Sequence, residues 1–216
     1  MALDFYHGHG SPFSWRVWLA LEAKAVMYDL KVLSFQSNDT AKPEFVAINP
    51  RHQVPTIVDN GFALWESVVI LEYLDERFSS GLKLYPGDNA NRARVRRLVK
   101  EAEEYIGAEG VSPITDELFF AGEGHTPDEE RVAKAREKLG EELGYFAKEL
   151  RGKFLAGDAP SAADFVLAPY LGYIARITFR KPETKLDELV PAKLRDYKKR
   201  IESLPYFDKT YPPHWR

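Results

Sequence analysis

Two patterns of apolar and polar positions divide the chain. Residues 1–80 combine short runs rich in Val, Ile and aromatic residues with stretches in which apolar residues recur at helical spacing. These runs predict a βαβαββα module. The predicted strands are residues 2–6, 28–32, 56–58 and 62–65, and the predicted helices are residues 14–23, residues 42–48 and a helix that begins at residue 66. From residue 90 onward only helical spacing recurs, so an all-helical domain is expected to follow the α/β domain.

Residues 81–89 form the predicted linker, because Gly, Pro and Ser gather there and the helical periodicity changes across them. The helical domain is residues 90–216. Its predicted helices cover residues 90–107, 111–120, 126–150 and 189–203, with a further helix that begins at residue 161. Thr126 and Ser161 are the predicted N-caps of two of them, since each is followed three positions later by an acidic residue, Glu129 and Asp164.

A hairpin with unusual flanks is the most informative stretch of the sequence. Asn60-Gly61 between two apolar runs is a strong signal for a tight turn. Val54-Pro55 leads into this hairpin and Glu66-Ser67 leads out of it into an amphipathic helix. A helix start has unpaired N–H groups and the positive end of a dipole, so it can bind a carboxylate without a basic side chain. An ordinary hairpin followed by a serine cap is the alternative interpretation.

Composition narrows the function classes. The chain has 216 residues, a formal net charge of −3 and no cysteine. The charge gives no attraction to nucleic acid or to anionic membranes. Without cysteine, disulfides, thiolate metal sites and cysteine nucleophiles are excluded. No run approaches the roughly 20 apolar residues of a membrane span, and the N-terminus lacks the pattern of a signal peptide, so we expect a cytoplasmic location.

Taken together, these motifs resemble the cytosolic glutathione S-transferases of the serine type, the tau, zeta and theta classes. The hairpin flanks carry the resemblance in the first domain, and the box Ser161-Ala162-Ala163-Asp164 carries it in the second. The resemblance implies a thioredoxin-like N-terminal domain, an all-helical C-terminal domain and a cytoplasmic detoxification enzyme. It also implies glutathione as co-substrate, a hydrophobic electrophile as second substrate, no metal and a homodimer, with no nucleic-acid or membrane partner.

The resemblance assigns the contacts of glutathione. The Val54 main chain, before a cis Pro55, is expected to pair with the cysteinyl backbone like an added strand. The helix start at Ser67 is expected to receive the γ-glutamyl carboxylate, and Glu66 the γ-glutamyl ammonium. Two further side chains are expected at the glycyl end, Gln53 and Lys42.

The candidate for activating the glutathione thiol is Ser11. The thiol needs a hydrogen-bond donor or a helix N-terminus to lower its pKa from near 8.5. Pro12 suits the first turn of a helix, which makes Ser11 a natural cap at the positive end of that helix. The Ser-Pro-Phe run is similar to that of tau-type transferases, which implies that Ser11 donates to the thiolate. Ser14 is the second choice, and Tyr6, His7 and His9 are the other groups that the same loop offers.

The electrophile site is the least determined by sequence. Fold analogy places it near His9 and Phe13, and near Tyr105 on the first long helix of the second domain. His7 and His9 could instead form a metal pair, although no third ligand is evident, or be plain loop residues. Three other functions stay open on the same fold: a glutathione-dependent isomerase, a dehalogenase or ether-cleaving lyase, and a non-catalytic binding module.

Overall fold

A computed structural model describes residues 3–122 and 124–216 of the protein. The chain forms two compact units. The first unit joins the N-terminal part, up to Pro86, with the C-terminal segment Leu204–Arg216, and the second unit is Gly87–Ser203. Residue 2, the first position of the predicted first strand, lies outside the described residues.

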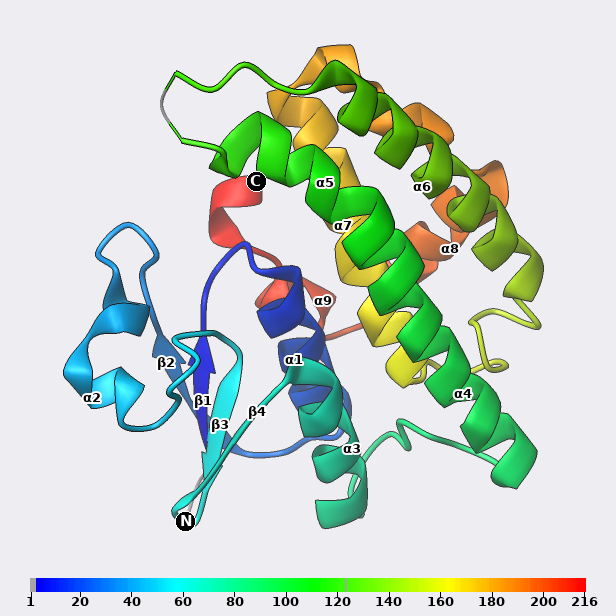
Figure 1. The fold of residues 1–216 in the computed structure, drawn as a ribbon. Helices are drawn as coiled ribbons and strands as arrows, with labels where there is room; N and C mark the ends of the chain where they lie inside the picture. The colour runs from blue at the N-terminus through cyan, green and yellow to red at the C-terminus, as the bar shows by residue number, and fades with distance from the viewer. Residues whose placement is uncertain (1–2, 123) are drawn as a thin grey trace. The chain divides into compact units, whose positions relative to one another are not determined.

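The first unit has the predicted thioredoxin-like order of elements (Figure 1). Its strands are β1 (Leu3–His7), β2 (Tyr28–Val32), β3 (Thr56–Asp59) and β4 (Phe62–Trp65), and its helices are α1 (Pro12–Ala23), η1 (Asp39–Ala41), α2 (Pro43–Val46) and α3 (Ser67–Arg77). They form one sheet in the order β2-β1-β3-β4, in which β1 runs parallel to β2 and antiparallel to β3. The prediction of the βαβαββα module is confirmed.

The core of this unit lies where α1 and α3 cover the sheet. Phe5 of β1 and Ile57 of β3 are fully buried, as are Leu19 of α1 and Ile70 of α3. Burial of such side chains supplies the main stabilisation, about 1.5–3 kcal/mol for each. Because the core fixes one face of α1 and one end of β1, it also fixes the loop between them, which carries Ser11.

The C-terminal segment differs from the sequence prediction, which counts it with the helical domain. Its short helices α9 (Phe207–Thr210) and η6 (Pro213–Trp215) belong to the first unit. The reason is an aromatic cluster on α1: the Trp15 ring lies 5.6 Å from Phe207 and 5.5 Å from Tyr211, centroid to centroid. The buried Trp15 Nε1–H also donates to Thr210 Oγ1 at 3.0 Å.

The second unit is helical, as predicted. Its helices are α4 (Asn89–Glu101), η2 (Ala102–Val111), α5 (Ser112–Thr115), η3 (Asp116–Phe120), α6 (Glu129–Glu149), α7 (Ala162–Arg180), η4 (Pro182–Thr184), η5 (Leu186–Leu189) and α8 (Ala192–Glu202). Two of these segments, η2 and η3, are π-helical. The predicted break between residues 107 and 111 is therefore absent from this described stretch, which stays helical from Asn89 to Phe120 with changed winding.

Two other helix starts differ from the prediction. The N-cap of α6 is Asp128 and not Thr126, because the Asp128 carboxylate accepts the Arg131 N–H at 3.0 Å while its own N–H donates to Glu117. The predicted helix 189–203 begins only at Ala192, after Pro191, which cannot supply a backbone N–H. The local cap signals thus predict correctly that a helix is present, but they place its start a few residues too early.

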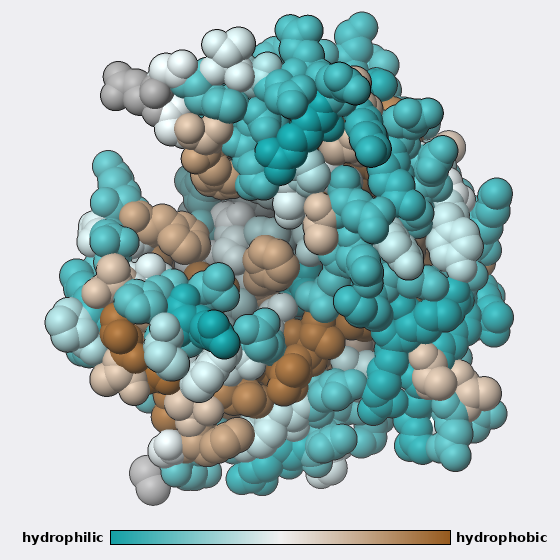
Figure 2. Space-filling view, in the orientation of Figure 1, coloured by the Kyte–Doolittle hydropathy of each residue, from teal (hydrophilic) through white to brown (hydrophobic). Residues whose placement is uncertain are grey.

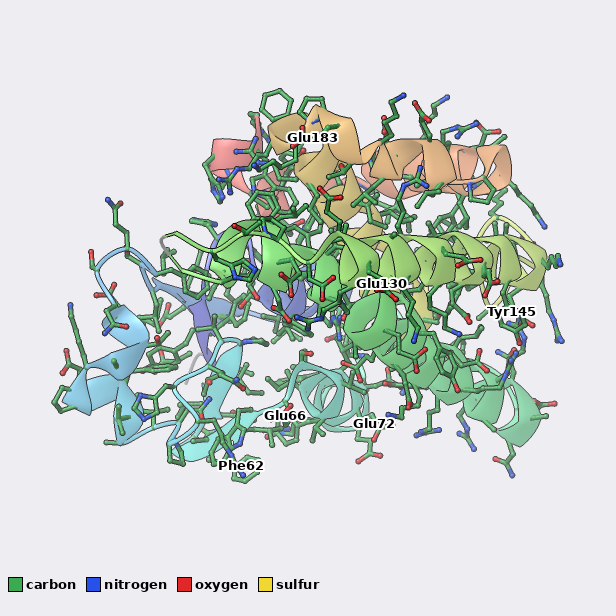
Figure 3. All side chains as sticks on the ribbon, turned by 45° about the horizontal axis from the view of Figure 1, so that its top comes forward. Phe62, Glu66, Glu72, Glu130, Tyr145 and Glu183 are labelled. Atoms are coloured by element: carbon green, nitrogen blue, oxygen red, sulfur yellow. The ribbon has the colours of Figure 1, made fainter. Side chains whose placement is uncertain are left out.

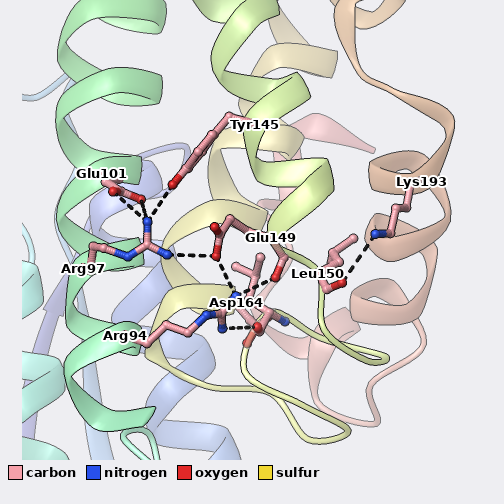
Figure 4. Close-up of polar contacts among 9 residues, drawn as sticks. Arg94, Arg97, Glu101, Tyr145, Glu149, Leu150, Asp164 and Lys193 are labelled. Atoms are coloured by element: carbon pink, nitrogen blue, oxygen red, sulfur yellow. Dashed lines mark hydrogen bonds and ion pairs between the residues drawn. The ribbon is translucent and has the colours of Figure 1, made fainter. Parts of the chain in front are cut away.

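A polar network ties the helices of the second unit together (Figure 4). Arg94 on α4 donates to the carbonyl oxygens of Leu155 and Glu149 at 2.6 Å and to the Glu149 carboxylate at 2.7 Å. Arg97, one turn further, contacts Glu149 at 2.9 Å and the Tyr145 hydroxyl at 2.6 Å. Most buried polar groups in proteins are hydrogen-bonded, as the two Nη atoms of Arg94 are here.

The predicted box at Ser161 forms at the start of α7 and is fully buried. The Asp164 carboxylate accepts the Ser161 N–H at 2.8 Å, the Leu155 N–H at 2.9 Å and the Tyr197 hydroxyl at 3.0 Å. Burial raises the pKa of Asp164, and these donors oppose that rise. The box therefore joins α7, the loop before it and α8.

Candidate functional site

A hollow of about 400 Å³ in the first unit gathers most of the predicted glutathione contacts. We call it the hairpin pocket, because the β3–β4 hairpin and its flanks form much of its wall. Its lining residues are Ser11, Phe13, Phe35, Asn49, His52, Gln53, Val54, Pro55, Trp65, Glu66 and Ser67. The loop before α1, the approach to β3 and the start of α3 thus meet at one place.

The start of α3 has the geometry of an anion site. Its N-cap is Glu66, which is labelled in Figure 3. The Glu66 backbone has φ 70° and ψ 104°, a conformation that L-residues rarely take. Ser67 is the first helical residue, so its N–H and those of Val68 and Val69 have no intrahelical acceptor, whereas the Ile70 N–H already donates to the Glu66 carbonyl oxygen at 2.9 Å. Opposite this helix start, the Val54–Pro55 peptide bond is cis, as predicted.

A buried arginine lies behind the start of α3. Arg16 of α1 is fully buried, and its Nη1 donates to the Ser67 hydroxyl at 3.2 Å. Its guanidinium also stands 5.0 Å from the centre of the Phe13 ring. The arginine therefore orients Ser67 and adds positive charge at the end of α3 where the helix dipole is already positive.

Ser11 and Ser14 have different surroundings. Ser11 is the N-cap of α1, and its Oγ accepts the Ser14 N–H at 3.2 Å. Ser11 is partly exposed and lines the hairpin pocket. Ser14 is fully buried, and its Oγ accepts the Gly8 N–H at 3.4 Å. Of the two hydroxyls, only that of Ser11 is therefore available to a ligand in the pocket.

The loop before the cis peptide bond is held by an asparagine that the sequence interpretation did not single out. The Asn49 amide donates to the Gln53 carbonyl oxygen and to Thr56 Oγ1, both at 2.9 Å, and its oxygen accepts the Arg51 N–H at 2.9 Å. His52, in the same loop, has a positive φ of 57°. The signal available in the sequence was Asn49-Pro50, a pair that favours turns.

Two aromatic lining residues, Phe35 and Trp65, were also missed. Phe35 follows β2 in a loop of small polar residues and Trp65 ends β4, and neither stands in a motif with recognisable chemistry. They reach the pocket only through the fold. Large aromatic side chains at such a site contribute apolar surface against a bound ligand.

Three predicted site residues are not among the residues that line the hairpin pocket. Lys42 pairs with Asp39 at 2.7 Å and lines a different hollow, beside Tyr6 and Phe45. This local ion pair, three residues apart, holds the lysine at the start of α2. His9 contacts His7, and Tyr105 belongs to the second unit, where the Lys138 ammonium stands 5.0 Å from its ring centre.

Known proteins are similar to this chain in both of its units. A family model described as the glutathione S-transferase N-terminal domain matches residues 10–77, and one described as the glutathione S-transferase C-terminal domain matches residues 112–205. Glutathione S-transferase A of Pleuronectes platessa is 30% identical over 217 residues, which cover 96% of this chain and 90% of that protein. The chain belongs to the glutathione S-transferase family. It is an enzyme of that family, whose members use glutathione as a substrate.

Other transferases support the assignment across the whole chain. Glutathione S-transferase D7 of Drosophila melanogaster is 30% identical over 181 residues, covering 82% of this transferase and 77% of that protein. The crystal structure of a glutathione S-transferase from the Antarctic clam Laternula elliptica has 28% identity and a TM-score of 0.82, covering 100% of this transferase and 94% of that chain. These matches include both units.

The described part of this transferase has neither a candidate metal cluster nor a candidate membrane-spanning helix. Within residues 3–122 and 124–216, no group of three or more His, Cys, Asp or Glu side chains has an arrangement that could hold a metal ion. Among the helices of the same residues, none combines the length and the apolar character that crossing a membrane requires. His7 and His9 are therefore not part of a three-ligand metal cluster within the described chain.

Proposed function

We propose that this transferase binds glutathione in the hairpin pocket and conjugates its thiolate to a small hydrophobic electrophile, with the Ser11 hydroxyl as the activating donor. The observation that carries the proposal is that Ser11 lines the same hollow as Pro55, Glu66 and Ser67. One wall thus offers a helix start suited to a carboxylate, and another offers a hydroxyl suited to a thiolate.

The γ-glutamyl end is assigned to the start of α3. Its free N–H groups, the Ser67 hydroxyl and the charge of Arg16 behind it all favour a carboxylate. Glu66 supplies the acceptor for the neighbouring ammonium. The Val54 main chain, beside the cis peptide bond, is assigned to the cysteinyl backbone, and Gln53 to the glycyl end. In place of Lys42, His52 is the lining residue that could contact the glycyl carboxylate.

Thiol activation is assigned to Ser11 because its hydroxyl proton is available to donate a hydrogen bond. Its oxygen accepts the Ser14 N–H, and a hydroxyl that accepts one hydrogen bond still has its proton to donate. The serine also stands at the N-terminus of α1, where the helix dipole favours a negative charge. Both effects stabilise a thiolate over a thiol and so lower the thiol pKa.

The test is Ser11→Ala, with Ser14→Ala as the matched variant three residues away. A hydroxyl bond to a charged group contributes about 1.5–3 kcal/mol, so Ser11→Ala should raise the pKa of the bound thiol by about 1–2 units. Turnover near neutral pH should fall about tenfold or more by the same arithmetic. The pKa is followed by thiolate absorbance of bound glutathione, and glutathione affinity by calorimetry, which should change little.

The outcomes separate the alternatives. If Ser14→Ala abolishes turnover and Ser11→Ala does not, the assignment of the donor is wrong. Wild-type protein that binds glutathione but fails to conjugate any electrophile of a broad panel would favour the binding module. Activity on isomerisation or reductive dehalogenation substrates, without conjugation, would favour the alternative reactions on the same fold.

We also propose a homodimer and a cytoplasmic detoxification role. Phe62 on β4 and Val69 on α3 expose large apolar side chains. Figure 2 shows apolar surface in this region of the first unit. Exposed apolar patches commonly mark protein contacts. Light scattering at micromolar concentration checks the dimer, and Val69→Glu should weaken it. A wild-type monomer would refute this part without affecting the thiol chemistry.

A further inference from the structure

Two histidines of the loop before α1 are in direct contact. His7 Nε2 lies 3.0 Å from His9 Nδ1, and the two rings cross at 75°. His7 ends β1 and is 1% exposed, and its ring packs against Trp18 at 4.6 Å between centroids. His9 is therefore held by a neighbour that cannot itself move without disturbing the core.

Burial favours the neutral form of both histidines. It lowers the pKa of His7 to about 3, so His7 is neutral near pH 7. The pKa of His9 is also lowered, first by burial and then by the nearby His214. With both imidazoles neutral, each carries one ring proton, and the 3.0 Å contact must contain one N–H donor and one bare nitrogen.

The other nitrogen of His7 decides which ring donates. His7 Nδ1 is buried and has no hydrogen-bond partner among the residues that the structure describes. A buried N–H without an acceptor is rarer in proteins than an acceptor without a donor. The His7 proton therefore belongs on Nε2, where it is donated to His9 Nδ1. His9 must then carry its own proton on Nε2, the nitrogen that faces away from His7.

His9 is close to the thiol donor by chain geometry. Gly8, His9, Gly10 and Ser11 form one turn, closed by the Ser11 N–H to the Gly8 carbonyl oxygen at 3.2 Å. Gly10 has φ +88°, as the third position of a type II turn requires. Two residues apart, the Cα atoms of His9 and Ser11 are separated by at most about 7 Å. The turn therefore brings the backbone of His9 next to the residue proposed to hold the thiolate.

We propose that His9 is a neutral N–H donor, oriented by His7, to the oxygen of an electrophile, and that it favours α,β-unsaturated carbonyl compounds over alkyl halides. The inference rests on the proposed function, because it needs the thiolate at Ser11. The sulfur electron pair forms a bond to the β-carbon, and the double-bond electrons move towards the carbonyl oxygen. The resulting enolate oxygen accepts the His9 Nε2–H hydrogen bond. Its α-carbon then takes a proton from water, which balances the proton lost by the thiol.

The reaction of an alkyl halide develops no negative charge on an oxygen that His9 could stabilise. In that reaction the carbon–halogen bond breaks as the carbon–sulfur bond forms, and the charge leaves on the halide ion. A fixed donor that meets the negative charge only as it develops lowers the barrier of one reaction and not of the other. The preference between the two classes of electrophile is therefore the property to measure.

The first test is the tautomer, read in the protein without glutathione. Long-range proton–nitrogen NMR distinguishes the protonated ring nitrogen of each histidine. We expect both His7 and His9 protonated on Nε2, and a mixture of His9 tautomers in His7→Phe. A proton on His9 Nδ1 in the wild type overturns the inference, whatever the fate of Ser11.

The second test is selectivity between benzylideneacetone, an enone, and benzyl chloride. His9→Phe should lower kcat/KM for the enone about tenfold, the effect of one hydrogen bond to a developing charge, and change that for benzyl chloride less than about twofold. His9→Gln, which keeps an N–H donor, should recover part of the loss, and His214→Gln should leave the ratio unchanged.

These outcomes separate two failures. Equal losses for both electrophiles in His9→Phe would make His9 a structural residue and overturn this inference alone. So would a wild-type enzyme that uses benzyl chloride but not benzylideneacetone. Failure of the proposed function has a different signature, namely that Ser11→Ala leaves turnover of both electrophiles and the thiol pKa unchanged.

Discussion

The starts of α1 and α7 carry the same residue type, serine, in contrasting surroundings. At α7, the Ser161 hydroxyl donates to Asp164, whose carboxylate also takes donors from Leu155 and Tyr197, and the site is fully buried. At α1, the Ser11 oxygen accepts one N–H and the serine lines a pocket. A cap whose hydrogen-bonding capacity is used up inside the protein stabilises the fold, whereas a cap with capacity left at a pocket can act on a ligand.

The strongest challenge to this comparison is Asp164→Ala. It leaves the N–H groups of Leu155 and Ser161 and the Tyr197 hydroxyl without their buried acceptor. We expect the free energy of unfolding to fall by about 3 kcal/mol, measured by urea denaturation. The exposed Glu188→Gln is the control. Turnover per folded molecule should stay unchanged, and a loss of turnover without a loss of stability would contradict a purely structural box.

The second prediction concerns the caps themselves. Ser161→Ala should lower the free energy of unfolding by about 1–2 kcal/mol, the usual cost of losing a cap, without changing the thiol pKa of bound glutathione. Ser11→Ala should do the reverse, with a clear effect on the thiol and a smaller one on stability, because its site is partly open to solvent. If Ser161→Ala and Ser11→Ala had the same effects on the free energy of unfolding and on the thiol pKa, the distinction between the two caps would be wrong.

The third prediction tests how tightly the turn before α1 is held. A methyl group at Gly10 would come within 3.0 Å of His214 Nε2, and Gly10 has φ +88°. Gly61 has nearly the same φ, +85°, but nothing within 4 Å of such a methyl group. Gly61→Ala should therefore lower the free energy of unfolding by about 1 kcal/mol, the cost of an L-residue at a positive φ. Gly10→Ala should lower the free energy of unfolding by more than this and should also reduce turnover. Equal losses of stability in the two variants would show that the C-terminal segment with His214 moves aside without cost.

The start of α6 provides a pH-dependent case. Glu117 accepts the Asp128 N–H at 3.0 Å, and this bond, followed by those from His125 and Arg131, lowers the pKa of Glu117 from 4.5 to about 2. A carboxyl whose pKa is lowered by folding stabilises the protein above the unfolded-state pKa, and this contribution disappears as the pH falls through the folded-state value.

Glu117→Gln should therefore be less stable than the wild type at pH 7. The difference in Tm should persist down to about pH 4.5, the ordinary pKa of the carboxyl, and shrink towards pH 2. Thermal unfolding of both proteins across this range is the measurement. The variant Glu130→Gln, changed at an exposed glutamate two residues after the cap Asp128, is the control. A Tm difference that is independent of pH would mean that the charge of Glu117 does not matter.

Features that rest on neighbouring residues could be predicted from the sequence. The Asn60-Gly61 turn, the cap at Ser11 and the box at Ser161 all depend on side chains within a few positions of the backbone that they serve. Their chemistry is local, so the order of residues is enough to indicate them. This is also why the βαβαββα order of the first unit was predictable. The cis bond at Val54–Pro55 was implied by the resemblance to the transferases.

Features that rest on distant residues were decided by the tertiary structure. Nothing near Trp15 in the sequence reveals that Thr210 bonds to it, so the C-terminal segment was counted with the helical domain. In the π-helical segment η2, Gly107 approaches the Tyr170 hydroxyl so closely that a methyl group there would come within 2.4 Å of it, a contact that the sequence does not indicate. Lys42 was expected among the glutathione contacts, but it pairs with Asp39 and is not a lining residue of the hairpin pocket.

The sequence by itself determined the helix and strand order, the hairpin with its flanks, and the serine at the start of α1, because hydrogen bonds and backbone preferences between near neighbours specify them. Only the tertiary structure decided which of these groups share one pocket, which serine keeps a usable hydroxyl, and that His7 lies against His9 with its other nitrogen buried. Those properties depend on burial, and burial is set by side chains that the folded chain brings together from distant positions.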